Sequence, residues 1–130
     1  SKGIRFHTAV NKFCLNAAIN EDIHVYKTAL HQFRPYLSLS DALKSFKFCI
    51  EKDFFQNDIF NILSGNFTVN QILKMIKKYK KKIYVKLVDA EIMNQLSYHV
   101  SKDKIEKEGL NLNYKIEKDI KNTLKLLGNI

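Results

Sequence analysis

Residues 68–83 constrain the fold most, because their apolar and basic side chains fall on opposite faces of a helix. On a wheel of about 100° per residue, the apolar residues share one arc of roughly 120°. The opposite arc carries Lys74, Lys77, Lys78, Lys81 and Lys82. Thr68 has a side-chain oxygen suited to capping the start of a helix. The pattern predicts an amphipathic helix with its apolar face on the protein and its lysines in solvent.

The sequence leaves the end of this helix open. Residues 82–88 read KIYVKLV, and a run of this kind, rich in β-branched residues, can form a strand. Leu87 and Ala90 nevertheless continue the apolar stripe at helical spacing, so we expect helix here rather than strand.

Glycine and proline are scarce along the whole chain, which contains four glycines and Pro35 in 130 residues. All-β domains use these residues at their turns, so their scarcity favours helices with short connections. We therefore predict an all-α fold of six or seven helices, arranged as a compact bundle or as a short helical-repeat array. The predicted helices cover about 4–19, 21–33, 41–53, 58–63, 68 to at least 83, 89–109 and 113–127.

The length suits one domain, and we expect residues 1–130 to form a single all-helical unit with one core. Ser1, in place of an initiating Met, is compatible with a tag remnant or with a domain excised from a larger protein. No run of about eighteen uncharged apolar residues occurs, so no transmembrane segment is predicted. Cys14 and Cys49 stand among apolar residues, and we interpret both as small buried side chains in a reducing compartment. The expected location is intracellular, in the cytoplasm or the nucleus.

Several residues echo one another along the N-terminal half. An alanine stands four places before a phenylalanine in AVNKF, ALHQF and ALKSF, at residues 9–13, 29–33 and 42–46. Residues 24–67 resemble a degenerate tetratricopeptide repeat. Its first helix would hold Tyr26, Leu30 and Phe33, its second Ala42, Phe46 and Cys49, and the next repeat would open with Phe60, Leu63, Ser64 and Phe67. The resemblance implies an α-solenoid that binds peptides or other proteins on a concave face.

The positive charge is concentrated in one segment. The net charge is +9, and between Asp58 and Asp89 there is no acidic residue but there are seven lysines. Like charges on one helix face repel one another, and bound anions would compensate them. The candidate residues for binding an anionic partner are Lys74, Lys77, Lys78, Lys81, Lys82 and Lys86. The alternative is a solvated face in a lysine-rich sequence.

The sequence contains no recognisable catalytic, metal-binding or cofactor-binding motif. We therefore expect a chain that is not an enzyme and has no cofactor, and predict a scaffold or adaptor module for protein–protein interaction with a basic helical face. Its predicted partner is a protein with an acidic surface or a peptide. The alternative is a nucleic-acid-binding module that contacts the phosphate backbone through the lysines of residues 74–86. Peripheral membrane contact is not expected.

Overall fold

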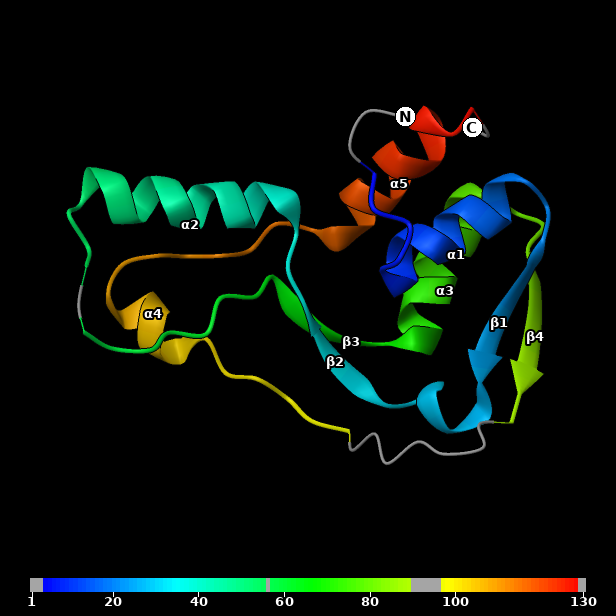
Figure 1. Ribbon diagram of the computed structural model, residues 1–130, viewed down its shortest axis with the longest axis horizontal. Coiled ribbons are helices and arrows are strands. Elements are labelled where there is room, and N and C mark those ends of the chain that lie inside the picture. Colours follow the sequence, from blue (N-terminus) through cyan, green and yellow to red (C-terminus); the bar gives the residue numbers. More distant parts are fainter. Residues whose placement is uncertain (1–3, 56, 90–96, 129–130) are drawn as a thin grey trace. The chain divides into compact units, whose positions relative to one another are not determined.

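The structure is a computed structural model that describes residues 4–55, 57–89 and 97–128 (Figure 1). The helices are α1 (Ala9–Ala18), α2 (Leu39–Glu51), α3 (Val69–Tyr79), α4 (Asp103–Lys107) and α5 (Ile116–Leu126), with one 3-10 turn, η1 (Lys27–Ala29). The strands are β1 (Asp22–Tyr26), β2 (Phe33–Tyr36), β3 (Gly65–Thr68) and β4 (Tyr84–Val88). The prediction of an all-α fold is therefore wrong, because four segments of the described chain pair as strands.

The chain divides into two compact units that each draw on separate parts of the sequence. Unit 1 combines residues 1–32, 68–96 and 117–130, and unit 2 combines residues 33–67 and 97–116. Each unit contains one two-stranded sheet, β1 with β4 in unit 1 and β2 with β3 centred on unit 2.

In unit 1, β1 and β4 run parallel, with Ile23 opposite Val85 and Val25 opposite Leu87 (Figure 1). Along β1 the side chains alternate between exposed and buried, with Ile23 and Val25 buried. This period of two is the signature of a strand with one covered face. The buried apolar residues of the described helices of this unit include Cys14 and Ala17 of α1, Ile72, Leu73 and Ile76 of α3, and Ile120 and Leu124 of α5.

The predicted helix over residues 21–33 is replaced by β1 and η1. The helix α1 ends at Ala18, and Asn20 adopts a left-handed backbone with φ of 60°. Asparagine tolerates this conformation better than most residues, and it stops a helix. The chain then leaves α1 in an extended direction, and tertiary pairing with β4 overrides the local helical spacing of the apolar residues.

The amphipathic helix predicted from residue 68 exists, but it is shorter than expected. The Thr68 side chain accepts a hydrogen bond from the Gln71 amide, and the Gln71 side chain accepts one from the Thr68 amide, which forms a capping box. The helix ends at Tyr79, and Lys80 is already extended. Residues 84–88 form β4, so the expectation that residues 82–88 are helical is wrong.

In unit 2, the core consists of Ile105, Leu110 and Leu112, with partly buried aromatic side chains packed around them. The rings of Phe54 and Phe60 lie 5.2 Å apart in an edge-on arrangement. The short helix predicted over residues 58–63 is absent. The chain has no helical structure there and continues to β3. The helix predicted over residues 89–109 is also wrong in its described part, where only Asp103–Lys107 is α-helical; residues 90–96 lie outside the described residues.

The tetratricopeptide resemblance is contradicted as well. Tyr26 and Phe33, which the repeat would place on one helix, belong to the strands β1 and β2. Phe67 lies on β3 rather than at a helix start. The matching spacings therefore do not correspond to stacked helical hairpins.

The two cysteines are free thiols in different surroundings. Cys14 is fully buried in the core of unit 1, where burial raises the pKa of its thiol from 9.0 to about 12. Cys49 is half-buried on α2. No helix in the described part of the chain is long and apolar enough to cross a bilayer.

Candidate functional site

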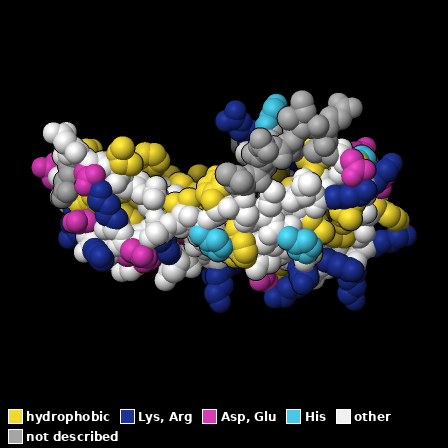
Figure 2. Space-filling view, turned by 90° about the horizontal axis from the view of Figure 1, so that it is seen from below, with side chains coloured by type: hydrophobic (Ala, Val, Ile, Leu, Met, Phe, Trp, Pro, Cys, Tyr) yellow, Lys and Arg dark blue, Asp and Glu magenta, His cyan; other side chains and the backbone are white. Residues whose placement is uncertain are grey.

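The lysines predicted to form one surface are divided between three parts of unit 1. The set comprises Lys74, Lys77 and Lys78 on α3, Lys81 and Lys82 in the turn after it, and Lys86 on β4. In Figure 2, basic side chains project from the surface of unit 1. Because α3 ends at Tyr79, the continuous helical lysine face does not form.

Two of these lysines have partners within unit 1. The Lys78 ammonium lies 2.6 Å from Glu117 Oε1, and the Tyr79 hydroxyl donates to the same oxygen at 2.6 Å. The hydrogen bond from Lys78 to Glu117 raises the pKa of Lys78. The Lys82 ammonium lies 5.3 Å from the centre of the Tyr84 ring. Within the described ranges, no ion pair forms at the other four. The binding of all six lysines to an anionic partner stays a prediction.

Lys74 and Lys77 border a groove of about 530 Å³ beside β4. Its floor is formed by Leu73, Val85 and Leu87. Val85 and Leu87 are 40% and 45% exposed, so this side of β4 is only partly covered. The groove combines an apolar floor with a basic border, but its described lining contains no carboxylate, histidine or thiol that could act as an acid, a base or a nucleophile.

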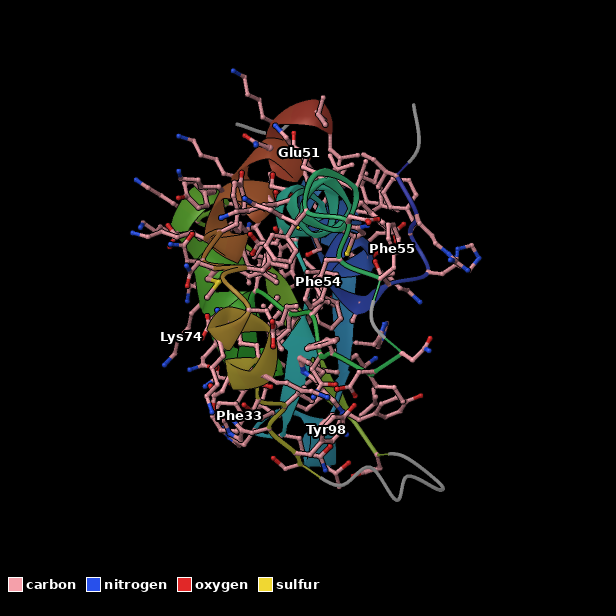
Figure 3. The ribbon with its side chains drawn as sticks, turned by 90° about the vertical axis from the view of Figure 1, so that its left-hand side faces the viewer. Phe33, Glu51, Phe54, Phe55, Lys74 and Tyr98 are labelled. Carbon is pink, nitrogen blue, oxygen red and sulfur yellow. The ribbon has the colours of Figure 1, made fainter. Side chains whose placement is uncertain are left out.

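A second cluster, in unit 2, gathers an arginine and several aromatic rings around β2. Arg34 lies on β2, and its guanidinium carbon is 5.0 Å from the centre of the Tyr98 ring. Its Nη1 donates a hydrogen bond of 2.8 Å to the Phe33 carbonyl. The Phe33 and His99 rings lie 4.2 Å apart, centre to centre. Figure 3 shows Phe33 and Tyr98 close together in this region. We call these residues (Phe33, Arg34, Tyr98 and His99) the arginine cluster.

Residues 97–100 are held beside the β2–β3 pair by several hydrogen bonds. The Ser97 hydroxyl accepts from the Phe33 amide at 3.0 Å. The Asn66 side chain on β3 forms two bonds of 3.0 Å with the backbone of Val100, one donated and one accepted. These bonds position Tyr98 and His99 against β2, although more than 60 residues of chain separate them from Phe33.

The surroundings of Arg34 combine positive charge with accessible aromatic surface. Arg34 and Tyr36 stand two residues apart on β2 and so lie on the same face of the strand. Burial raises the pKa of the Tyr36 phenol, and the positive charge of Arg34 opposes this shift. Tyr98 is 49% exposed. A guanidinium can bind two phosphate oxygens at once, and aromatic rings can stack on a base or a sugar. The arginine cluster therefore suits a ligand with a phosphate and a planar ring.

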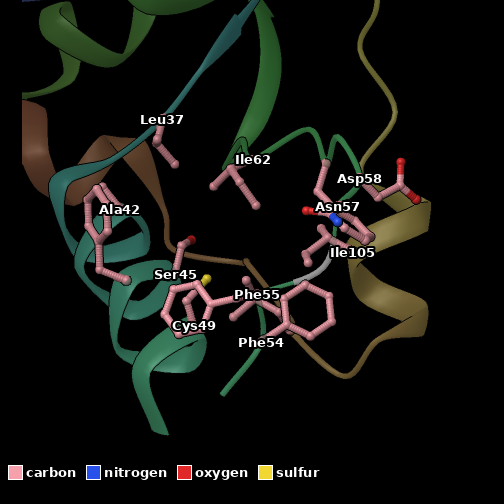
Figure 4. Close-up of a pocket in the computed structure, with 13 residues that line it drawn as sticks. Leu37, Ala42, Ser45, Cys49, Phe54, Phe55, Asn57, Asp58, Ile62 and Ile105 are labelled. Atoms are coloured by element: carbon pink, nitrogen blue, oxygen red, sulfur yellow. The ribbon is translucent and has the colours of Figure 1, made fainter. Parts of the chain in front are cut away.

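An apolar pocket of about 490 Å³ also lies in unit 2 (Figure 4). Ser45 and Cys49 of α2 line it on one side and Ile105 of α4 on another, with Phe54 and Phe55 between them. Asp58 at its border is paired with Lys104, whose hydrogen bond lowers the pKa of the Asp58 carboxyl. The pocket presents apolar surface and no assembled catalytic group among the described residues.

The one buried carboxylate among the described residues is Asp41, near the start of α2. It accepts hydrogen bonds from the Ser64 hydroxyl at 2.6 Å and from the Tyr114 amide at 3.2 Å. The same Ser64 hydroxyl accepts from the Ser38 amide. These bonds join α2, the residue before β3 and the segment before α5, so the carboxylate has a structural role. In the described chain no cluster of metal-ligating side chains is present.

No protein-family model matches this sequence, and no curated protein matches it. Solved structures do match the fold. The UDP-glucose 4-epimerase of Thermus thermophilus, in complex with NAD, is 16% identical with a TM-score of 0.77 over 92% of this chain. The ADP-L-glycero-D-manno-heptose-6-epimerase of Helicobacter pylori is 18% identical, with a TM-score of 0.68 over 95%. The NADP-bound GDP-mannoheptose C4 reductase of Campylobacter jejuni is 14% identical, with a TM-score of 0.64 over 99%.

These matches define the class of fold, a mixed α/β fold shared with part of these two epimerases and this reductase. The chain spans only 40%, 38% and 46% of the three matched chains. Its parallel β1–β4 pair is Rossmann-like. The prediction of a non-catalytic adaptor, and its nucleic-acid-binding alternative, are wrong, because the fold is one that enzymes acting on sugar nucleotides use. The helical-repeat class is wrong for the same reason.

The described residues do not fit a dinucleotide cofactor. Dinucleotide-binding folds place three closely spaced glycines between a strand and the helix that receives the pyrophosphate. The four glycines here are Gly3, Gly65, Gly109 and Gly128, too far apart for that motif. The first turns of α2 and α3 already donate capping bonds to their own Ser38 and Thr68 side chains. We therefore assign no redox step to this chain.

Sequence reasoning missed the arginine cluster. The one signal available was composition, because Arg34 is one of only two arginines among 22 basic residues and stands between Phe33 and Pro35. Nothing in the local pattern indicated that Tyr98 and His99 lie beside it.

Proposed function

We propose that this chain is the sugar-nucleotide-binding part of an NAD(P)-dependent enzyme that modifies the sugar of a nucleoside diphosphate sugar. The observation that carries the proposal is the arginine cluster, in which Arg34 stands among accessible rings on a fold used by such enzymes. The three matched proteins act, by their names, on UDP-, ADP- or GDP-linked sugars. A diphosphate and a base are the features common to these ligands.

In this proposal Arg34 binds the diphosphate, and Tyr98 and His99 bind the base or the sugar. Arg34 donates to diphosphate oxygens through its guanidinium fork, which lysine cannot reproduce. Tyr98 and His99, both exposed, provide ring surface for stacking on the base or the sugar. The Asn66 and Ser97 hydrogen bonds are positioning contacts, because they fix residues 97–100 beside β2.

The test is a titration of the isotope-labelled chain with UDP-glucose, GDP-mannose and ADP-glucose, followed by NMR. We expect at least one of them to shift the amide signals of residues 33–36 and 97–99 in a saturable way, and glucose alone to shift none. Arg34→Lys should weaken binding by about tenfold or more, because a bidentate charged contact is lost.

The matched control is Arg5→Lys, which makes the same chemical change at the other arginine of the chain, which is exposed. It should leave the affinity unchanged. Equal losses in the two variants would show that the effect is not specific to Arg34, because both substitutions keep the positive charge. The absence of saturable shifts with all three sugar nucleotides would overturn the proposed function.

A further inference from the structure

The helix α2 directs much of its apolar surface outward. Leu39, Leu43, Phe46 and Ile50 follow one another at four-, three- and four-residue steps and so share one narrow face. They are 72%, 60%, 70% and 72% exposed. We call these four residues the α2 stripe.

The opposite face of α2 is covered, although it is the more polar one. Asp41 and Ser45 are buried there, and the Ser45 hydroxyl donates to the Asp41 carbonyl at 2.8 Å. Lys44 donates to the Asn111 carbonyl at 2.6 Å, so the segment before α5 lies alongside the helix. The core of unit 2 therefore fixes the rotation of α2, and the stripe cannot turn inward without breaking the Asp41 bonds.

A third face of α2 is charged and exposed, with Lys47 and Glu51 forming an ion pair of 3.5 Å. The α2 stripe is therefore an exposed apolar face on a helix that is already packed on its polar side. Large exposed apolar patches are uncommon on protein surfaces and mark interaction sites. The stripe also continues onto Leu37 and Phe55, which are 44% and 72% exposed at the border of the apolar pocket (Figure 4).

The lengths of the matched structures indicate what covers this surface. The chain accounts for 38–46% of the three matched enzymes, and its described residues lack the glycines that a dinucleotide requires. An enzyme of the proposed kind therefore needs a dinucleotide-binding segment from elsewhere, and that segment must pack against this chain so that cofactor and sugar nucleotide can meet.

We propose that the α2 stripe is the docking surface for a dinucleotide-binding domain, supplied by further sequence of the same protein. This inference rests on the proposed function. The domain's contact surface is apolar, since the stripe carries no charge, and burying the four side chains is the stabilising contribution of the contact.

The experiment compares the 130-residue chain with the complete product of the gene that encodes it. Amide hydrogen exchange in residues 39–51 should be roughly tenfold or more slower in the complete product. Leu43→Lys together with Phe46→Lys should restore the faster exchange and lower the Tm of the complete product by several degrees. The same double variant should leave the Tm of the 130-residue chain unchanged or raise it, because the stripe is already in water there.

The matched control is Glu51→Lys, which adds the same two units of positive charge on the solvated face of the same helix. It also removes the Lys47–Glu51 ion pair, but that pair is exposed and contributes little. The control should therefore change exchange in α2 and the Tm only slightly, and by the same amount in both proteins. Equal α2 exchange in the two wild-type proteins, a double variant that destabilises the 130-residue chain itself, sedimentation that shows two copies of the chain joined through the stripe, or a gene product without a dinucleotide-binding segment would each overturn the proposal.

The outcome is separable from that of the ligand titration. A protected α2 stripe in a protein that binds no sugar nucleotide would refute the proposed function and keep the docking surface. Sugar-nucleotide binding with an unprotected stripe would support the proposed function and refute the docking surface.

Discussion

At the scale of single residues, the structure depends on a few polar side chains in positions that sequence patterns do not reveal. Asp41 lies on α2 among residues that look like an ordinary helix start, yet it is only 3% exposed and connects three segments. Arg34 was one basic residue among many in the sequence, and only the fold brings it near the Tyr98 ring. The sequence shows which residues can form such contacts, but not which residues they contact.

Removing the Asp41 carboxylate should destabilise unit 2 strongly. Asp41→Ala leaves the Ser64 hydroxyl and the Tyr114 amide without this acceptor, and a loss of this kind costs about 3 kcal/mol. Asp41→Asn keeps one carbonyl oxygen and should lose less. Urea unfolding monitored by circular dichroism gives both values.

The comparison variant is Asp103→Ala, which removes an exposed carboxylate from the first turn of α4. It should change the unfolding free energy by less than about 0.5 kcal/mol. A similar loss for the two alanine variants would show that the Asp41 bonds do not stabilise the fold.

At the scale of elements, the sequence was informative wherever structure depends on local spacing. The helices α1, α2, α3 and α5 lie largely within segments predicted to be helical. The strands were missed, because β1 and β4 pair across more than fifty residues and their short apolar runs also fit a helical stripe. Parallel strands are not joined by a short hairpin turn, so the sequence contains no turn motif that would predict their pairing. Spacing identifies the apolar face of α2 but not whether that face lies in the core or in solvent.

The capping box at the start of α3 provides a test of local stability. Thr68→Ala removes the side-chain oxygen that accepts from the Gln71 amide, and it should cost about 1 kcal/mol. Thr68→Ser keeps that oxygen and should cost much less. Thermal unfolding of the three proteins measures the difference, and equal Tm values for the serine and alanine variants would contradict a stabilising cap.

At the scale of the whole molecule, the chain has the fold of part of a larger kind of enzyme, with two compact units and no dinucleotide motif in its sequence. This explains why the predicted function was wrong. The absence of catalytic motifs suggested an adaptor, but a lack of motifs does not distinguish an adaptor from a part of an enzyme. The basic charge that directed attention to α3 lies in unit 1, whereas the arginine cluster lies in unit 2.

The central claim is that this chain holds the sugar nucleotide and not the dinucleotide. Parallel titrations with UDP-glucose, GDP-mannose, ADP-glucose and NAD⁺, each followed by NMR on the same labelled protein, test it most directly. We predict saturable shifts at residues 33–36 and 97–99 with a sugar nucleotide and no saturable change with NAD⁺. Saturable binding of NAD⁺ at these residues, tighter than that of every sugar nucleotide, would contradict it.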